Sequence, residues 1–114
     1  MSDEMRARPQ GPVGDSYAID GIWVVAARGE LDSETIGPLN ETLVEAGNLH
    51  PIVVLDASAV TFADSTCLNM LLRVHRITRL RIAAPRQQLV RLLALTGADT
   101  VLDVHTTLDE AVRA

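Results

Sequence analysis

The sequence predicts a single α/β domain, a mixed β-sheet of about four to five strands with about four helices packed on it. With 114 residues, the chain can form one hydrophobic core. Its apolar residues, 47% of the total, alternate between short β-branched runs and stretches with helical spacing. The resulting order, β-β-α-β-α-β-α-β-α, is typical of parallel or mixed strands covered by helices.

The N-terminal part divides into a leader and a hairpin. Residues 1–15 carry two of the five prolines and show no periodicity, which predicts a flexible leader before a domain spanning residues 16–114. Tyr17 and Ile19, an Asp20-Gly21 turn signal and the apolar run 22–27 then predict a β-hairpin.

A helix is expected after the second strand, with Asp32 or Ser33 as its cap. Pro38 fits its first turn, and Gly47 is expected to end it. Its apolar stripe consists of Ile36, Leu39, Leu43 and Ala46.

The strongest signal is the stretch 52–72, which reads as a strand, a short polar loop and a helix start. Residues 52–55 are apolar and mostly β-branched, which predicts a buried strand. Ser58 and Thr61 are most simply loop residues. The run Asp64-Ser65-Thr66 supplies side-chain oxygens where the first free N–H groups of a helix need acceptors.

The helix after this loop is expected to run from Ser65 to about Arg79. Its apolar side is broad, while Asn69, Arg73 and Arg76 lie together at i, i+4 and i+7. That flank is therefore available to a partner.

The C-terminal part predicts two more strands and two more helices. A strand over residues 80–84 stops at Pro85, which also suits the start of the next helix, and Gly97 closes that helix. Residues 101–105 form a last strand, and the capping box 107–110 opens a terminal helix.

Composition excludes several classes of function. The net charge is −5, all ten positive residues are Arg and they are dispersed, and only three residues are aromatic, so nucleic acid is not an expected ligand. Without Lys there is no P-loop or Schiff-base chemistry. No signal peptide or membrane-spanning stretch is recognisable, so a cytoplasmic protein without membrane insertion is expected.

A hydrolase triad and a metal site both fail on spacing. Ser65 and His75 are separated by roughly 15 Å along one predicted helix, and no nucleophile elbow surrounds Ser65. His50 and His105 lie in other elements, so no metal site and no cofactor are expected.

The rival from another class is a thiol or phosphotransfer enzyme that uses Cys67 or Asp56. Cys67 lies near a helix start, where thiolate is favoured, but its neighbours are apolar and there is no second Cys. A small buried side chain is the better interpretation. Asp56 lacks the acid cluster and the lysine of a phospho-accepting site.

Ser65 has two interpretations. It can be a plain helix-start hydroxyl that contributes about 1 kcal/mol to stability. It can also be a phosphorylation site, because helix N-termini tolerate phosphate and the exposed flank of the same helix lies beside it.

Three stretches of the chain are similar to the STAS domains of bacterial anti-sigma-factor antagonists. Residues 54–68 resemble the family signature Asp-Leu-Ser-x-Val-x-Phe-x-Asp-Ser-Ser-Gly-Leu. Residues 29–32 resemble its strand end, and residues 92–97 its late helix closing on Gly. The resemblance covers about residues 17–114.

The resemblance implies a binding protein and not an enzyme. It makes Ser65 the phospho-acceptor, and the partner-binding residues are expected to be Asp32, Asp64, Ser65, Thr66, Asn69 and Arg73. The unphosphorylated form would bind an anti-sigma factor of the GHKL serine-kinase type and free a sigma factor. The kinase would then use ATP to phosphorylate the antagonist and break the complex, and a phosphatase would reverse this.

Two positions depart from the family pattern. Cys67 stands where the family has Gly, which adds a side chain that a partner could meet, and Thr66 replaces Ser. The nearest alternative is a STAS subunit of an ABC-transporter complex for lipid trafficking, which needs no phosphate.

Overall fold

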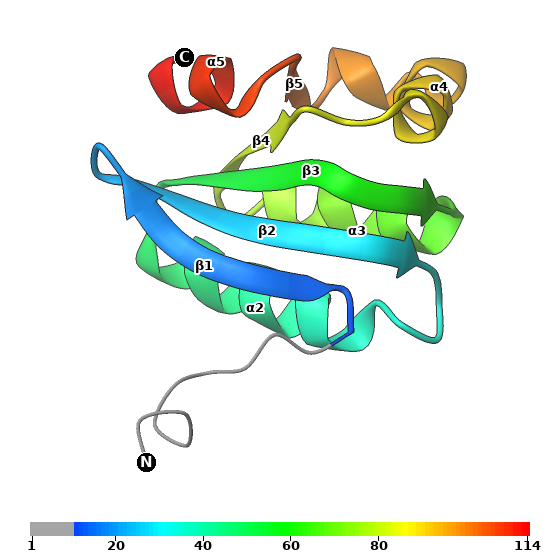
Figure 1. Ribbon diagram of the computed structural model, residues 1–114, viewed down its shortest axis with the longest axis horizontal. Helices are drawn as coiled ribbons and strands as arrows, with labels where there is room; N and C mark the ends of the chain where they lie inside the picture. The colour runs from blue at the N-terminus through cyan, green and yellow to red at the C-terminus, as the bar shows by residue number, and fades with distance from the viewer. Residues whose placement is uncertain (1–10) are drawn as a thin grey trace.

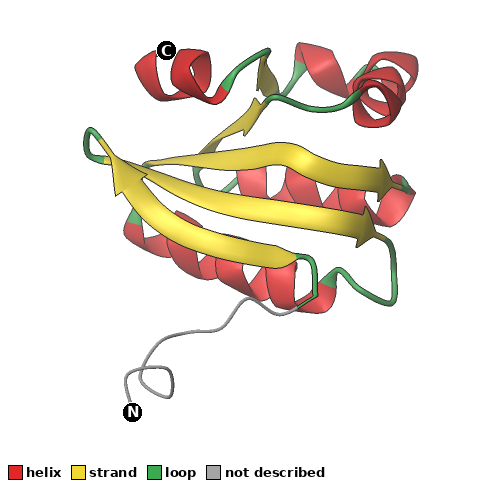
Figure 2. Cartoon of the chain, viewed as in Figure 1, coloured by secondary structure: helices red, strands yellow, loops and turns green. Residues whose placement is uncertain are grey.

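The computed structural model describes residues 11–114, which form a five-stranded sheet and four α-helices (Figure 1, Figure 2). The strands are β1 (Val13–Ile19), β2 (Ile22–Leu31), β3 (Ile52–Ala63), β4 (Arg79–Ala83) and β5 (Asp103–His105). The helices are α2 (Gly37–Leu49), α3 (Ser65–His75), α4 (Gln87–Thr96), the 3-10 helix η1 (Ala98–Thr100) and α5 (Leu108–Arg113). The predicted fold class is confirmed.

The sheet is mixed, as expected. Strand β1 pairs antiparallel with β2, and the strands β2 to β5 run parallel in the order of the chain. Asp20 and Gly21 form the turn of the first hairpin with φ of 50° and 81°. Both angles are positive, as a tight hairpin turn requires. Parallel strands end at the same edge, so the carboxyl ends of β2 and β3 lie together.

The two faces of the sheet are covered unequally. Helices α2 and α3 lie behind the sheet in Figure 1, and together with α4 they enclose the larger, aliphatic core. Helix α5 packs on the opposite face, against a small cluster made by Val24, Val54, Ala83, Ala111 and Val112. None of the described helices is long and apolar enough to cross a membrane.

The prediction of a polar loop after residue 55 is wrong, because β3 continues to Ala63. Its second half pairs with the end of β2 across two register shifts, so the backbone polar groups of this polar stretch have strand partners. Ser58 and Thr61 are therefore exposed strand residues. Gly29, beside this irregular pairing, has a φ of 73°, a conformation that favours glycine.

The predicted cap of α2 is also wrong. Neither Asp32 nor Ser33 caps this helix, because a turn precedes it and its N-cap is Ile36, which has no side-chain cap. Pro38 does lie in the first turn, as predicted. Gly47 does not end the helix, which continues to Leu49.

Close packing explains the glycine inside α2. A Cβ at Gly47 would lie 3.1 Å from side-chain carbons of both Ile77 and Thr78, so α2 approaches the connection between α3 and β4 closely. Helix α3 ends at His75 and not near Arg79, because the chain turns there and β4 begins at Arg79.

The ends of the domain differ in length from the prediction. Strand β1 begins at Val13, which pairs with Ala27, so residues 13–15 of the expected leader belong to the sheet. Residues 1–10 of that leader lie outside the described part of the chain. Strand β5 is shorter than the predicted strand 101–105, since η1 and a turn precede it.

Two predicted helix signals near the C-terminus are confirmed. Gly97 closes α4 with a left-handed φ of 77°. Thr107 caps α5 by accepting a hydrogen bond from the N–H of Glu110. The Glu110 carboxylate reaches back to Thr106, one residue before the position expected in a capping box.

Candidate functional site

Ser65 is the first residue of α3, and its side chain is exposed. Asp64, in extended conformation, is the N-cap: its Oδ1 accepts from the N–H of Thr66 at 2.9 Å and of Cys67 at 3.2 Å. The cap satisfies two N–H groups that the helix itself leaves without acceptors. Within residues 11–114 the Ser65 hydroxyl forms no hydrogen bond, so it is available to an approaching protein.

The sheet positions this helix start. Leu31 at the end of β2 pairs with Ala63 at the end of β3, and the N–H of Asp64 donates to the Leu31 carbonyl oxygen at 3.3 Å. Asp32 therefore follows β2 at the same edge where Asp64 follows β3. The expected partner residues Asp32, Asp64, Ser65 and Thr66 are brought to one edge of the sheet.

The Asp32 carboxylate is hydrogen-bonded within the turn that follows β2. Its Oδ1 accepts from the N–H groups of Glu34 at 2.9 Å and Thr35 at 3.0 Å. The Thr35 hydroxyl in turn donates to the carbonyl of Glu30 at 2.7 Å. Asp32 thus shapes the loop beside Ser65 and uses its carboxylate for that purpose.

Gln88, for which the sequence carries no local signal, links α4 to the site. Its side-chain amide accepts from the Ala63 N–H and donates to the Ala63 carbonyl, each at 2.8 Å. Both backbone groups of the residue before the Asp64 cap are thereby satisfied. No local pattern could reveal this role, because it depends on a contact across 25 residues of chain.

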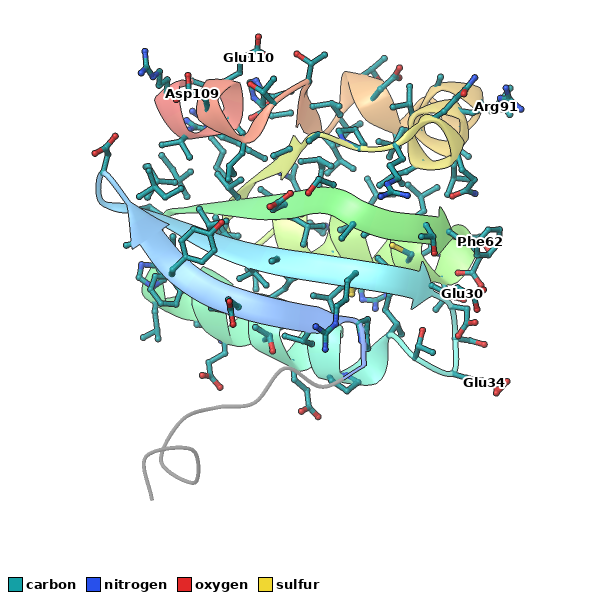
Figure 3. All side chains as sticks on the ribbon, viewed as in Figure 1. Glu30, Glu34, Phe62, Arg91, Asp109 and Glu110 are labelled. Carbon is teal, nitrogen blue, oxygen red and sulfur yellow. The ribbon has the colours of Figure 1, made fainter. Side chains whose placement is uncertain are left out.

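An aromatic side chain and two further carboxylates lie at the same end of the molecule. Phe62 is 43% exposed and pairs in register with Glu30, and Figure 3 shows Glu30, Glu34 and Phe62 at the end where β2 and β3 stop. Exposed aromatic side chains are enriched at protein-binding surfaces. The only sign of this role in the sequence is that Phe62 is a single aromatic residue among small and polar ones.

The other two expected partner residues lie further along α3. Asn69 and Arg73 are exposed, one and two turns after Ser65. At the usual helical rise Arg73 is about 12 Å from Ser65 along the axis. They extend the surface of the Ser65 edge but do not join the cluster there.

Cys67 points away from this surface. Its side chain is fully buried in the main core. Burial and, to a lesser extent, the charge of Asp64 raise the pKa of the thiol to about 12. The thiol is therefore protonated at neutral pH, and the side chain that replaces the family glycine meets the core and not a partner.

Asp56 and the histidines are also separate from Ser65. Asp56 is half-buried and accepts from the Ser58 N–H at 3.0 Å. The His75 Nδ1 accepts from the N–H of Leu80, and His50 stacks on Trp23 with ring centroids 4.9 Å apart. Across residues 11–114, no three potential metal-binding side chains come together.

Comparison with known proteins shows to which family this chain is similar. The family model described as "Mlab, STAS domain" matches residues 18–104. An anti-sigma factor antagonist from Mycobacterium paratuberculosis shares 30% identity, with a TM-score of 0.77, over 86% of this chain and 88% of that one. A search of the curated proteins found no match.

Two more distant structures share the fold. An anti-sigma-factor antagonist (STAS) domain protein from Planctomyces limnophilus has a TM-score of 0.78 at 17% identity, over 89% of this chain and 95% of that one. The anti-sigma factor antagonist SpoIIAA, in its unphosphorylated form, has a TM-score of 0.71 at 16% identity, over 86% and 91% of the two chains. At these identities the likeness concerns the architecture.

Proposed function

The chain belongs to the STAS domain family, and on that premise we propose that it acts as an anti-sigma factor antagonist. It binds an anti-sigma factor that is a serine kinase of the GHKL type and so frees a sigma factor for transcription. Phosphorylation of Ser65 ends the complex, and a phosphatase restores the binding form. The protein acts where transcription occurs, in the cytoplasm.

One observation carries this proposal: Ser65 presents an exposed hydroxyl at a helix start that is already capped by its neighbour Asp64. The hydroxyl contributes no hydrogen bond within residues 11–114, so the fold does not depend on it. A phosphate at a helix N-terminus is tolerated by the helix dipole. Modification can therefore change the surface without unfolding the domain.

The phosphate acts on the complex through its charge. It adds about −1.5 to −2 at neutral pH, on an edge that already carries Asp64 and, at the strand ends, Glu30 and Glu34. An interface fitted to a neutral hydroxyl would have to bury that charge without a matching cation. The expected result is loss of the complex.

The catalytic chemistry belongs to the kinase. The Ser65 Oγ attacks the γ-phosphorus of ATP, the bond from that phosphorus to the bridging oxygen breaks, ADP leaves, and the hydroxyl proton passes to a base of the kinase. The antagonist serves as ligand and then as substrate. This role requires no cofactor or metal of its own.

The competing functions receive less support. A thiol enzyme needs a thiolate, and burial raises the Cys67 pKa to about 12. Asp56 lies in mid-strand with its Oδ1 accepting from the Ser58 N–H. A subunit of a lipid transporter is not favoured by the structural relative at 30% identity, which is described as an anti-sigma factor antagonist.

The experiment uses a purified anti-sigma kinase of the GHKL type from the same organism. The protein is incubated with the kinase and Mg-ATP, and intact and fragment masses are measured for wild type, Ser65→Ala and the matched control Thr66→Ala. We expect one phosphate on Ser65 in wild type and Thr66→Ala, and none in Ser65→Ala. We also expect Ser65→Asp to lose kinase binding. No incorporation, together with unchanged binding by Ser65→Asp, would refute the proposal.

A further inference from the structure

The exposed face of α3 continues from Ser65 into a hollow at the far end of the helix. Ser65, Asn69, Leu72 and Arg76 follow one another at i, i+4, i+7 and i+11, and this spacing places them on one face. The hollow measures about 450 Å³. It is lined by Asn69, Leu72, Arg73, His75, Arg76 and Val101.

The floor of the hollow is apolar and comes from two separate segments. Leu72 belongs to α3, whereas Val101 follows η1 and is 55% exposed. An exposed Val that forms a common hollow with a half-buried Leu offers a site for one apolar side chain. Such a site depends on the tertiary structure, because the two residues are 29 positions apart in the sequence.

The rim is positively charged. Arg73 and Arg76 are exposed, and no carboxylate lines the hollow. Among residues 11–114 the only ion pair joins Arg113 to Asp109, so neither rim guanidinium is neutralised there. The C-terminal end of a helix favours cations, which explains the presence of Arg but not the apolar floor beside it.

We propose that this hollow is a second contact with the anti-sigma factor, and that it takes an apolar side chain flanked by carboxylates. This inference rests on the proposed function. The acidic edge lies at the start of α3 and the basic hollow at its end, so the two charges fix the direction in which the partner lies along the helix. The partner carries an acidic segment with an apolar side chain about 10 Å along the helix from its contact with Ser65, since Leu72 lies seven residues after Ser65.

The distance makes the two contacts separable. Arg73 lies about 12 Å from Ser65 along the helix axis, more than the roughly 7–10 Å within which substitutions usually couple. Phosphorylation should therefore leave the hollow intact. Effects of changes at Ser65 and at the hollow should multiply in the dissociation constant, as expected for distant and independent sites.

The test measures binding of the anti-sigma kinase, without ATP, by isothermal titration. The variants are Arg76→Glu and Val101→Asp, with Arg113→Glu as the matched charge reversal on α5, which packs on the other face of the sheet. We expect at least a tenfold loss of affinity for the two hollow variants and less than a twofold loss for the control. Urea midpoints within experimental error of wild type show that each variant is folded.

The salt dependence of binding tests the contribution of the rim charges. Raising the salt concentration should weaken wild-type binding more than Arg76→Glu binding, because the variant has lost one of the two attractive rim charges. Wild-type affinity in both hollow variants, with binding still lost in Ser65→Asp, would overturn the hollow and leave the proposed function standing. No binding by the wild-type protein would overturn both.

Discussion

Replacing Asp64 separates its two contributions, the helix cap and the negative charge. In Asp64→Ala the N–H groups of Thr66 and Cys67 lose their acceptor, which held them at 2.9 and 3.2 Å. Loss of such a cap costs about 1 kcal/mol, and we expect up to about 2 kcal/mol because these groups are partly buried. In Asp64→Asn the amide oxygen still accepts, so the expected loss is a few tenths of a kcal/mol.

Equilibrium unfolding in urea, followed by circular dichroism, measures these differences. A loss of 1 kcal/mol corresponds to about 5 °C in the melting temperature of a domain of this size. Glu41→Ala, an exposed change on α2, is the control and should stay within about 0.5 kcal/mol of wild type. The reasoning is refuted if Asp64→Ala is as stable as this control, or if Asp64→Asn is as unstable as Asp64→Ala.

Four other predictions follow from particular contacts. Gln88→Ala should lower the free energy of unfolding by about 2 kcal/mol in urea, because both backbone groups of Ala63 lose their partner; an unchanged midpoint would show that water replaces the amide. Phe62→Ala should weaken kinase binding and lower the urea midpoint only moderately, since the residue is 43% exposed; equal affinity would remove Phe62 from the interface. The Cys67 pKa is raised from 9.0 to about 12 by folding, so stability should be complete below pH 9 and fall between pH 9 and 12, and Cys67→Ala should flatten that part of the profile; identical slopes would contradict this. Gly29→Ala should cost about 1 kcal/mol in the same unfolding assay because φ is 73°, and a neutral effect would show that the turn relaxes.

The local features of this protein follow from its sequence. The order of strands and helices, the Asp20-Gly21 turn, the Asp64 cap and the closure of α4 at Gly97 all depend on residues close together in the chain. Periodicity and capping act over a few residues, so a single sequence contains their signals. The placement of Ser65 at a helix start belongs to this group, whereas its phosphorylation remains a prediction.

Contacts between distant segments decided the rest. The second half of β3 is a strand because the end of β2 pairs with it, and α2 holds a glycine at position 47 because a Cβ there would crowd Ile77 and Thr78. Gln88 reaches Ala63 across 25 residues.

The direction in which Cys67 points shows the same limit of sequence reasoning. Its place near the start of α3 is evident from the sequence, but only the packed helix shows that the thiol enters the core. The hollow beside Arg76 likewise exists because the segment after η1 brings Val101 against α3. Such contacts depend on how whole elements pack, and no short stretch of sequence contains that information.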